Sequence, residues 1–145
     1  MRNTQSNTND PDGLPPGKDN ARCPFCNLNT TTDLVLESGT AFAIFDKYPV
    51  SSGHVLVIPR RHCSGYFELT ADEQAACWQL LNDVAALIRE RFNPDGFNIG
   101  INIGRAAGQT IDHVHLHLIP RYDGDVEEPE GGVRGVIPRN QKYVF

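Results

Sequence analysis

His113-Val114-His115-Leu116-His117-Leu118-Ile119 is the stretch that decides how this chain folds. Three histidines alternate with aliphatic side chains, and such alternation predicts a half-buried β-strand. Side chains two positions apart in a strand share a face and lie ~6.6 Å apart. We therefore expect three imidazoles in a row on one face, with Val114, Leu116 and Leu118 pointing into a core. Imidazole acts as nucleophile, acid or metal ligand near neutral pH, so the row predicts a chemical site.

The size and charge of the chain restrict the class of protein. The 145 residues predict one domain with a real core. A net charge of −5 argues against a nucleic-acid-binding protein. No apolar stretch is long enough to span a membrane, and the first twenty residues lack the apolar segment of a signal peptide. We expect a cytoplasmic protein without nucleic-acid or membrane partners.

The chain divides into a tail and one folded domain. Residues 1–20 are polar and rich in Pro and Gly, which predicts a disordered tail. Residues 21–145 form the domain, and its C-terminal extension contains an acidic, Gly-rich loop at 123–132. A last short strand is expected at 133–137. The extension, including Gly131-Gly-Val-Arg-Gly-Val-Ile137, is a candidate to reach over a neighbouring site and shape the pocket for a leaving group there.

Hydrophobic patterning predicts an α+β domain with a mostly antiparallel sheet. The expected strands are 34–37, 41–45, 54–58, 97–103 and 113–119, with a hairpin turn at Ser38-Gly39. Thr70-Ala-Asp-Glu73 is a capping box that opens one long helix, which ends before Pro94. Its expected apolar face consists of Trp78, Leu81, Ala85, Ile88 and Phe92, with a second apolar edge at Leu80, Val84 and Leu87.

The loop Gly108-Gln109-Thr110 directly before the histidines has the composition of an anion site. Glycine lets backbone N–H groups approach a ligand, and Gln109 and Thr110 add side-chain donors. Asn102 lies near the end of the preceding strand, on the side that it shares with Asn98 and Gly100. The alternative is a plain Gly-rich turn with a polar rim. Beside three histidines, the anion site is the favoured interpretation.

A second constellation is Cys23-Pro-Phe-Cys26 with His62 downstream. Cys-x-x-Cys with two further histidine ligands is a common tetrahedral zinc set. The alternatives are a redox pair or two buried thiols, and redox is disfavoured because no βαβ pattern surrounds the motif. We expect the other cysteines, Cys63 and Cys77, to be inert.

The segment Asn102–Ile119 resembles the signature of the histidine triad (HIT) superfamily, His-φ-His-φ-His-φ-φ with φ apolar. Gly53-His54-Val-Leu-Val-Ile-Pro59 resembles the second recurrent block of that family. The resemblance implies a HIT-like fold with one long helix plus a short one, in a homodimer. It also implies a nucleotidyl hydrolase or transferase that acts on the α-phosphate of nucleotides.

The resemblance also implies residue roles. His115 is the nucleophile that forms a covalent nucleotidyl-histidine, and His117 binds phosphate oxygens. Supporting roles fall to Gln109 and Thr110 near the phosphate or bridging oxygen, Asn102 near the phosphates or leaving group, Asp46 at the ribose hydroxyls, and His54 beside the nucleophile. For Asp46 and His54, a turn-initiating carboxylate and a strand-edge histidine are equally open. His113 completes the catalytic triad.

Several bacterial triad proteins and the galactose-1-phosphate uridylyltransferases are similar at the cysteines. This similarity implies a zinc site with four ligands: Cys23, Cys26, His62 and His113. Such a closed site has no open position, so the expected zinc is structural, and no organic cofactor is implied.

Gly-Gln-Thr and Pro120-Arg121 resemble the dinucleoside-polyphosphate hydrolases of the fragile-histidine-triad branch. We therefore expect an adenine or other purine nucleotide substrate such as Ap3A or Ap4A, with release of AMP. Alternatives within the family are a nucleoside phosphoramidate hydrolase and an Ap4A phosphorylase. Alternatives from other classes are a metal-dependent hydrolase whose histidine row holds catalytic zinc, and a non-catalytic nucleotide-binding module.

Overall fold

The computed structural model describes residues 20–28 and 34–143. The tail predicted for residues 1–20 therefore lies outside the described residues, except Asn20, which begins the short 3-10 helix η1 (Asn20–Arg22). The strands are β1 (Leu34–Ser38), β2 (Ala41–Phe45), β3 (Val55–Pro59), β4 (Gly96–Ile101) and β5 (Leu116–Arg121). One α-helix, α1 (Ala71–Phe92), follows the 3-10 turn η2 (Tyr66–Glu68). The described chain has the predicted α+β composition.

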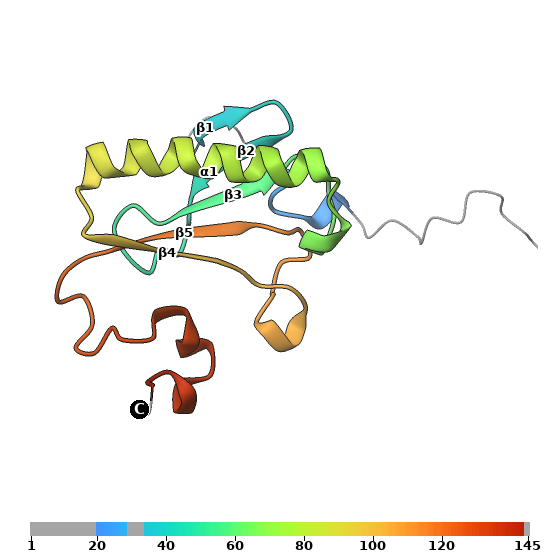
Figure 1. Cartoon of the computed structure of the whole chain (residues 1–145). Coiled ribbons are helices and arrows are strands. Elements are labelled where there is room, and N and C mark those ends of the chain that lie inside the picture. Colours follow the sequence, from blue (N-terminus) through green and yellow to red (C-terminus); the bar gives the residue numbers. More distant parts are fainter. Residues whose placement is uncertain (1–19, 29–33, 144–145) are drawn as a thin grey trace, which may run out of the picture.

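The five strands form one sheet in the order β1-β2-β3-β5-β4, and every neighbouring pair is antiparallel. The helix α1 lies across one face of this sheet (Figure 1). The register aligns Ile44 with Leu56, Leu56 with His117, and His117 with Gly100. Since cross-strand partners share a face, this row identifies the face that α1 does not cover.

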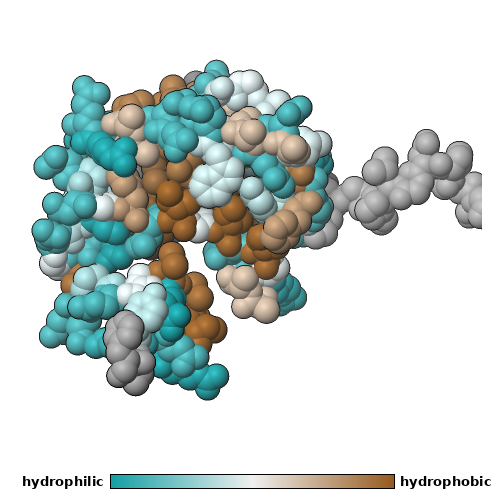
Figure 2. Space-filling view, in the orientation of Figure 1, coloured by the Kyte–Doolittle hydropathy of each residue, from teal (hydrophilic) through white to brown (hydrophobic). Residues whose placement is uncertain are grey.

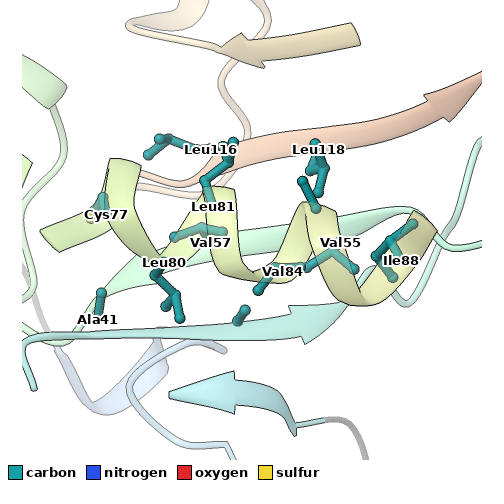
Figure 3. Close-up of a cluster of buried hydrophobic side chains, with 12 residues drawn as sticks. Ala41, Val55, Val57, Cys77, Leu80, Leu81, Val84, Ile88, Leu116 and Leu118 are labelled. Atoms are coloured by element: carbon teal, nitrogen blue, oxygen red, sulfur yellow. The ribbon is translucent and has the colours of Figure 1, made fainter. Parts of the chain in front are cut away.

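The main core lies between α1 and the sheet (Figure 3). Leu80, Leu81, Val84 and Ile88 of the helix meet alternate strand residues. The strand residues of this core are Ala41, Ala43, Val55, Val57, Leu116 and Leu118. The alternation of β5 is thus confirmed for its apolar half, because Leu116 and Leu118 are fully buried.

The helix begins where the capping box predicts. The Thr70 side chain accepts a hydrogen bond from the Glu73 amide, and the Glu73 carboxylate accepts one from the Thr70 amide. Asn93 ends the helix in the left-handed conformation, with φ of 48°. The buried face differs slightly from the prediction, since Cys77 and the second edge residues Leu80 and Val84 are core, whereas Trp78 is partly exposed.

A second layer covers the sheet face opposite α1. Phe42, Ile44, Leu56 and Ile58 pack there against Cys23 and Phe25 of the N-terminal segment. The C-terminal segment, drawn in red in Figure 1, also lies on this side. It contains two short 3-10 helices, η4 (Gly132–Val136) and η5 (Pro138–Asn140).

Two predictions about strands are wrong. The strand expected at 133–137 is the 3-10 helix η4, whose Gly131 and Gly132 have positive φ. The histidine strand begins at Leu116 rather than His113, because the Val114 amide bonds to the Cys63 carbonyl over 2.8 Å instead of joining the ladder.

Among the described residues, no helix is long and apolar enough to cross a bilayer.

Candidate active site and metal site

The His115 ring is oriented by the main chain. Its Nδ1 lies 2.8 Å from the carbonyl oxygen of His113. A carbonyl oxygen only accepts, so Nδ1 carries the proton and the neutral ring keeps a lone pair on Nε2. The ring packs edge-on against Phe25, with centroids 5.1 Å apart, and 8% of the residue is exposed. The local structure therefore fixes the tautomer that a nitrogen nucleophile requires.

A hydrogen bond from a neighbouring histidine, His54, determines which ring nitrogen of His117 carries the proton. The Val50 amide donates to His54 Nδ1 over 3.2 Å, so the His54 proton resides on Nε2. That Nε2–H faces His117 Nδ1 at 3.0 Å. The proton of His117 is therefore on Nε2, and this nitrogen is buried without a hydrogen-bond partner among the described residues. A buried donor left unpaired is costly unless a ligand supplies the acceptor.

The rings of His115 and His117 lie side by side, with centroids 5.0 Å apart. Burial, together with the neighbouring imidazoles of His115 and His54, lowers the pKa of His117 to about 4, although the Asp46 carboxylate opposes the shift. Burial also holds the pKa of His54 below its ordinary value. His54 and His117 are thus uncharged at neutral pH, and His117 acts as a neutral donor.

Asp46 lies at the end of β2, beside this histidine pair. Its Oδ1 accepts from the Tyr48 amide at 2.9 Å, and its Oδ2 lies 3.4 Å from His54 Nδ1. Since His54 is neutral and its Nδ1 already accepts from Val50, this last contact is not an ion pair. Asp46, His54 and His117 therefore form one cluster.

The predicted row of three imidazoles is corrected at His113. This residue is fully buried and precedes β5, and its ring turns toward Cys23 and Cys26 rather than toward His117. His113 Nε2 lies 2.8 Å from the Pro59 carbonyl and must donate to it. The unprotonated Nδ1 is left facing the two sulfur atoms, at 3.4 Å and 3.6 Å.

The four predicted metal ligands are brought together. The donor atoms of Cys23, Cys26, His62 and His113 all lie within 4.8 Å of one another. His62 Nδ1 is 3.3 Å from Cys26 Sγ. In tetrahedral zinc sites, Zn–S and Zn–N bonds place sulfur and nitrogen about 3.6 Å apart. The donor set, its spacing and the tautomer of His113 therefore fit a zinc ion.

The loop with η3 (Arg105–Ala107) holds Gln109 in internal hydrogen bonds. Its amide hydrogens donate to the carbonyls of Ser64 at 2.7 Å and Ile111 at 3.1 Å, while its oxygen accepts from the Gly104 amide at 2.8 Å. Both donors of the side chain are therefore used. Donation to a phosphate requires one of these bonds to be exchanged.

Thr110 and Asn102, the other two predicted phosphate contacts, differ in exposure. Thr110 is exposed and Asn102 is half-buried. The structure gives the Asn102 side chain no hydrogen-bond partner among residues 20–28 and 34–143, so its amide is available to a ligand. Asn102 follows β4 on the face that also carries Gly100, which is opposite His117.

A cavity with both polar and apolar walls lies on the uncovered face of the sheet, beside Cys26 and His62. Its volume is about 690 Å³, within the range of small-molecule sites. Phe25, Leu28, Phe42 and Ile44 supply its apolar walls. Phe25 also packs against the ring of His115, so one wall of the cavity contacts that ring.

The sequence interpretation missed two residues on this face. Asn98 is the register partner of Ile119, one row from His117, and its oxygen accepts from Arg121 at 2.6 Å. In the sequence, Arg121 is identified only as part of the Pro120-Arg121 resemblance. For Asn98, the alternation gives one indication, because this residue shares its side of the strand with Asn102.

Comparison with protein families gives a match to the HIT domain over residues 27–124. This chain belongs to the HIT domain family. The bis(5'-adenosyl)-triphosphatase of Dictyostelium discoideum is 36% identical over 96 residues, which cover 66% of this chain and 64% of that enzyme. The AP-4-A phosphorylase of Mycobacterium tuberculosis is 34% identical over 107 residues, covering 70% of this chain and 55% of that protein.

A solved HIT structure supports the fold. The Zn-bound histidine triad family protein of Mycobacterium smegmatis superposes with a TM-score of 0.68 at 33% identity, over 75% of this chain and 81% of that one. The chain spans less than two thirds of the triphosphatase and of the phosphorylase. The HIT fold predicted from the histidine pattern is confirmed.

Proposed function

We propose that this HIT protein cleaves nucleoside polyphosphates at the α-phosphate, with His115 as nucleophile. The observation that carries the proposal is the hydrogen bond from His115 Nδ1 to the His113 carbonyl, which leaves a lone pair on Nε2. The unpaired Nε2–H of His117 stands next to it. The cavity beside Phe25 takes the purine against its apolar walls, and the Asp46 carboxylate accepts hydrogen bonds from the ribose hydroxyls.

The first step exchanges one bond at phosphorus. His115 Nε2 forms a P–N bond with the α-phosphorus while the P–O bond to the leaving phosphate breaks. The bonding electrons leave with the bridging oxygen. His117 Nε2–H donates to a non-bridging oxygen, and its donation strengthens as negative charge grows there. Asn102 is the second donor available to the phosphate.

The second step hydrolyses the covalent intermediate and regenerates the free enzyme. Water attacks phosphorus, the P–N bond breaks, and one proton of the water is released, so that AMP and free His115 remain. A phosphorylase would use inorganic phosphate in this step and release ADP. The names of the two relatives, a triphosphatase and a phosphorylase, support a substrate of the Ap3A or Ap4A class.

Mass spectrometry after an acid-free quench with excess diadenosine triphosphate tests the covalent step. We expect the mass of one AMP on a peptide that contains His115. The products then separate the alternatives: one AMP and one ADP per diadenosine triphosphate indicate a hydrolase, two ADP formed only with added phosphate indicate a phosphorylase, and turnover of adenosine phosphoramidate alone indicates a phosphoramidase. Absence of a nucleotide adduct together with chelator-sensitive turnover would point to a metal-dependent hydrolase instead.

We also assign a structural zinc to Cys23, Cys26, His62 and His113. When bound, the metal neutralises the thiolates and holds the N-terminal segment against the sheet. The chain itself contributes the Pro59 carbonyl, which fixes the ring of His113. Metal analysis of the purified protein should give one zinc per chain.

A homodimer is proposed through the edge of the sheet. β4 is the last strand of the sheet, and Ile99 on it and Leu87 on α1 are partly exposed. An open edge with apolar neighbours favours pairing with a second copy. Light scattering of the wild type should give twice the chain mass, and Ile99→Lys should give a monomer.

A further inference from the structure

A second cavity lies on the sheet face that carries His117. Its volume is about 380 Å³, and it opens between the sheet and the C-terminal segment. Figure 2 shows a hollow between that segment and the rest of the molecule. The residues that line the cavity are Val50, Ser51, Asn98, Ile119, Arg121, Asp125, Val126, Pro129, Gly132, Gly135 and Gln141. None of these residues lines the first cavity, the one beside Phe25.

The register connects this second cavity to the catalytic row. Asn98 pairs with Ile119, and Gly100 pairs with His117, so the cavity begins one row beyond the catalytic imidazole. Residues two apart in a strand are separated by ~6.6 Å, which is within reach of a substituent on the bound phosphate. A Cβ added to Gly100 would meet no atom within 4 Å, so the path beside His117 is open.

Asn98 presents two free donors to this cavity. Its Oδ1 is occupied by Arg121 Nη1 at 2.6 Å, which fixes the orientation of the amide. Its Nδ2 has no hydrogen-bond partner in the part of the chain that the structure describes. Gly132 faces Nδ2, and a Cβ there would lie 3.3 Å away, so the missing side chain leaves room beside these donors.

The charged side chains in the walls of this cavity balance each other. Arg121 forms a bidentate pair with Asp125, at 2.6 Å and 2.7 Å, so that its charge is balanced. Arg134 joins η4 to η5 by donating to the carbonyls of Gln141 and Asn140. Apolar side chains such as Ile119 and Val126 fill the remaining lining. A balanced charge with apolar walls suits an uncharged ribose and base better than a phosphate.

We infer that this cavity binds the nucleoside of the leaving group, with Asn98 as its recognition residue. The inference rests on the proposed function, because it names the second half of the same substrate. Asn98 donates to a ribose hydroxyl or a base acceptor, and Arg121 acts only as a positioning residue. The enzyme therefore favours substrates that carry a nucleoside on both ends of the phosphate chain.

Two substrates that share the α-phosphate chemistry test the assignment. Diadenosine triphosphate has a second nucleoside, and the p-nitrophenyl ester of AMP has none. We expect Asn98→Ala to lower kcat/KM for diadenosine triphosphate roughly tenfold, the size of one lost hydrogen bond. The aryl ester should change by less than about twofold. Asn82→Ala, on the exposed side of α1, is the matched control and should alter neither substrate.

Binding without turnover provides the second measurement. Calorimetry should show that a methylene analogue of diadenosine triphosphate binds wild-type protein more tightly than AMP does, and that Asn98→Ala removes this advantage. Equal losses on both substrates, or equal affinity of the analogue and AMP, would overturn the subsite. If neither substrate is turned over, the proposed function fails, and the calorimetry still decides whether the subsite exists.

Discussion

His115 donates its Nδ1–H to the carbonyl oxygen of His113, over 2.8 Å. The two residues take part in different clusters, since the His113 side chain faces Cys23 and Cys26 while its main chain orients the His115 ring. A change in the position of His113 therefore changes the direction of His115 Nε2. The proposed metal ligands and the proposed catalytic ring are connected through one peptide group.

Replacement of the proposed nucleophile should separate binding from catalysis. We expect His115→Ala to lower turnover of diadenosine triphosphate more than a thousandfold, because no other described group offers a nitrogen lone pair beside His117. AMP affinity should stay within a few-fold of wild type. Calorimetry and product analysis check both values, and near-normal turnover in the variant would refute the covalent route.

Removal of the proposed zinc should affect both stability and the orientation of the proposed nucleophile, His115. We expect a chelator, or Cys26→Ser, to lower the Tm by several degrees, at ~3–5 °C per kcal/mol for a chain of this size. The kcat should fall more than the KM rises, because the orientation of His115 depends on His113. Cys63→Ala is the control, since Cys63 lies outside the ligand cluster. Full activity and unchanged Tm in metal-free protein would contradict this coupling.

The role of His54 can be distinguished from simple packing. His54→Ala removes the Nε2–H that faces His117 Nδ1, so the orientation of the His117 donor is lost. We expect kcat to fall at least about tenfold with a smaller change in KM. His54→Gln can place an amide N–H near the same point and should restore part of kcat. If Gln and Ala behave alike, His54 acts only by filling space.

Acid should destabilise the protein through His117. Its pKa is about 4 in the folded state and near 6.5 when exposed, so between these values the unfolded chain binds the additional proton. The free energy of unfolding should therefore decrease as the pH falls from about 6.5 to about 4, and this contribution is constant above and below that window. His117→Asn keeps an acceptor for His54 but does not titrate. Denaturant unfolding across this range should show a flatter pH dependence for the variant.

The helix cap provides a stability test remote from the site. Thr70→Ala removes the acceptor of the Glu73 amide and should cost ~1 kcal/mol of unfolding free energy. The ion pair with Arg61 holds the pKa of Glu73 near 2, so the remaining half of the box stays charged. Thr70→Ser retains the hydroxyl and should be nearly neutral in urea unfolding, with turnover unchanged in both variants.

The sequence predicted correctly those helices and strands whose pattern lies entirely within the element itself. The strand Ala41–Phe45 and the helix start at Thr70 depend on alternation and on a cap, and both were found at the expected residues. The start of β5 was mispredicted because a distant carbonyl, that of Cys63, captures the Val114 amide. The residues around Val133 form a 3-10 helix because Arg134 ties the segment to Gln141.

The site was predictable as residue types but not as geometry. The sequence indicated the histidines and the four proposed metal ligands, His113 among them, but the alternation also placed His113 in one row with His115 and His117. The cysteines that draw His113 away lie 87 to 90 positions earlier in the chain, and alternation carries no information about them. The internal bonds of Gln109 and the free amide of Asn98 likewise depend on side-chain contacts that no local pattern encodes.

The place of β5 inside the sheet has a consequence for inactivation. β3 and β4 flank it on both sides, so the amide hydrogens along His117 are shielded from solvent by two ladders. Deuterium exchange at these amides will require opening of the entire sheet. On heating, the His117 ring should therefore stay in place until the whole molecule unfolds. Enzymatic activity and folded structure should then be lost at the same temperature.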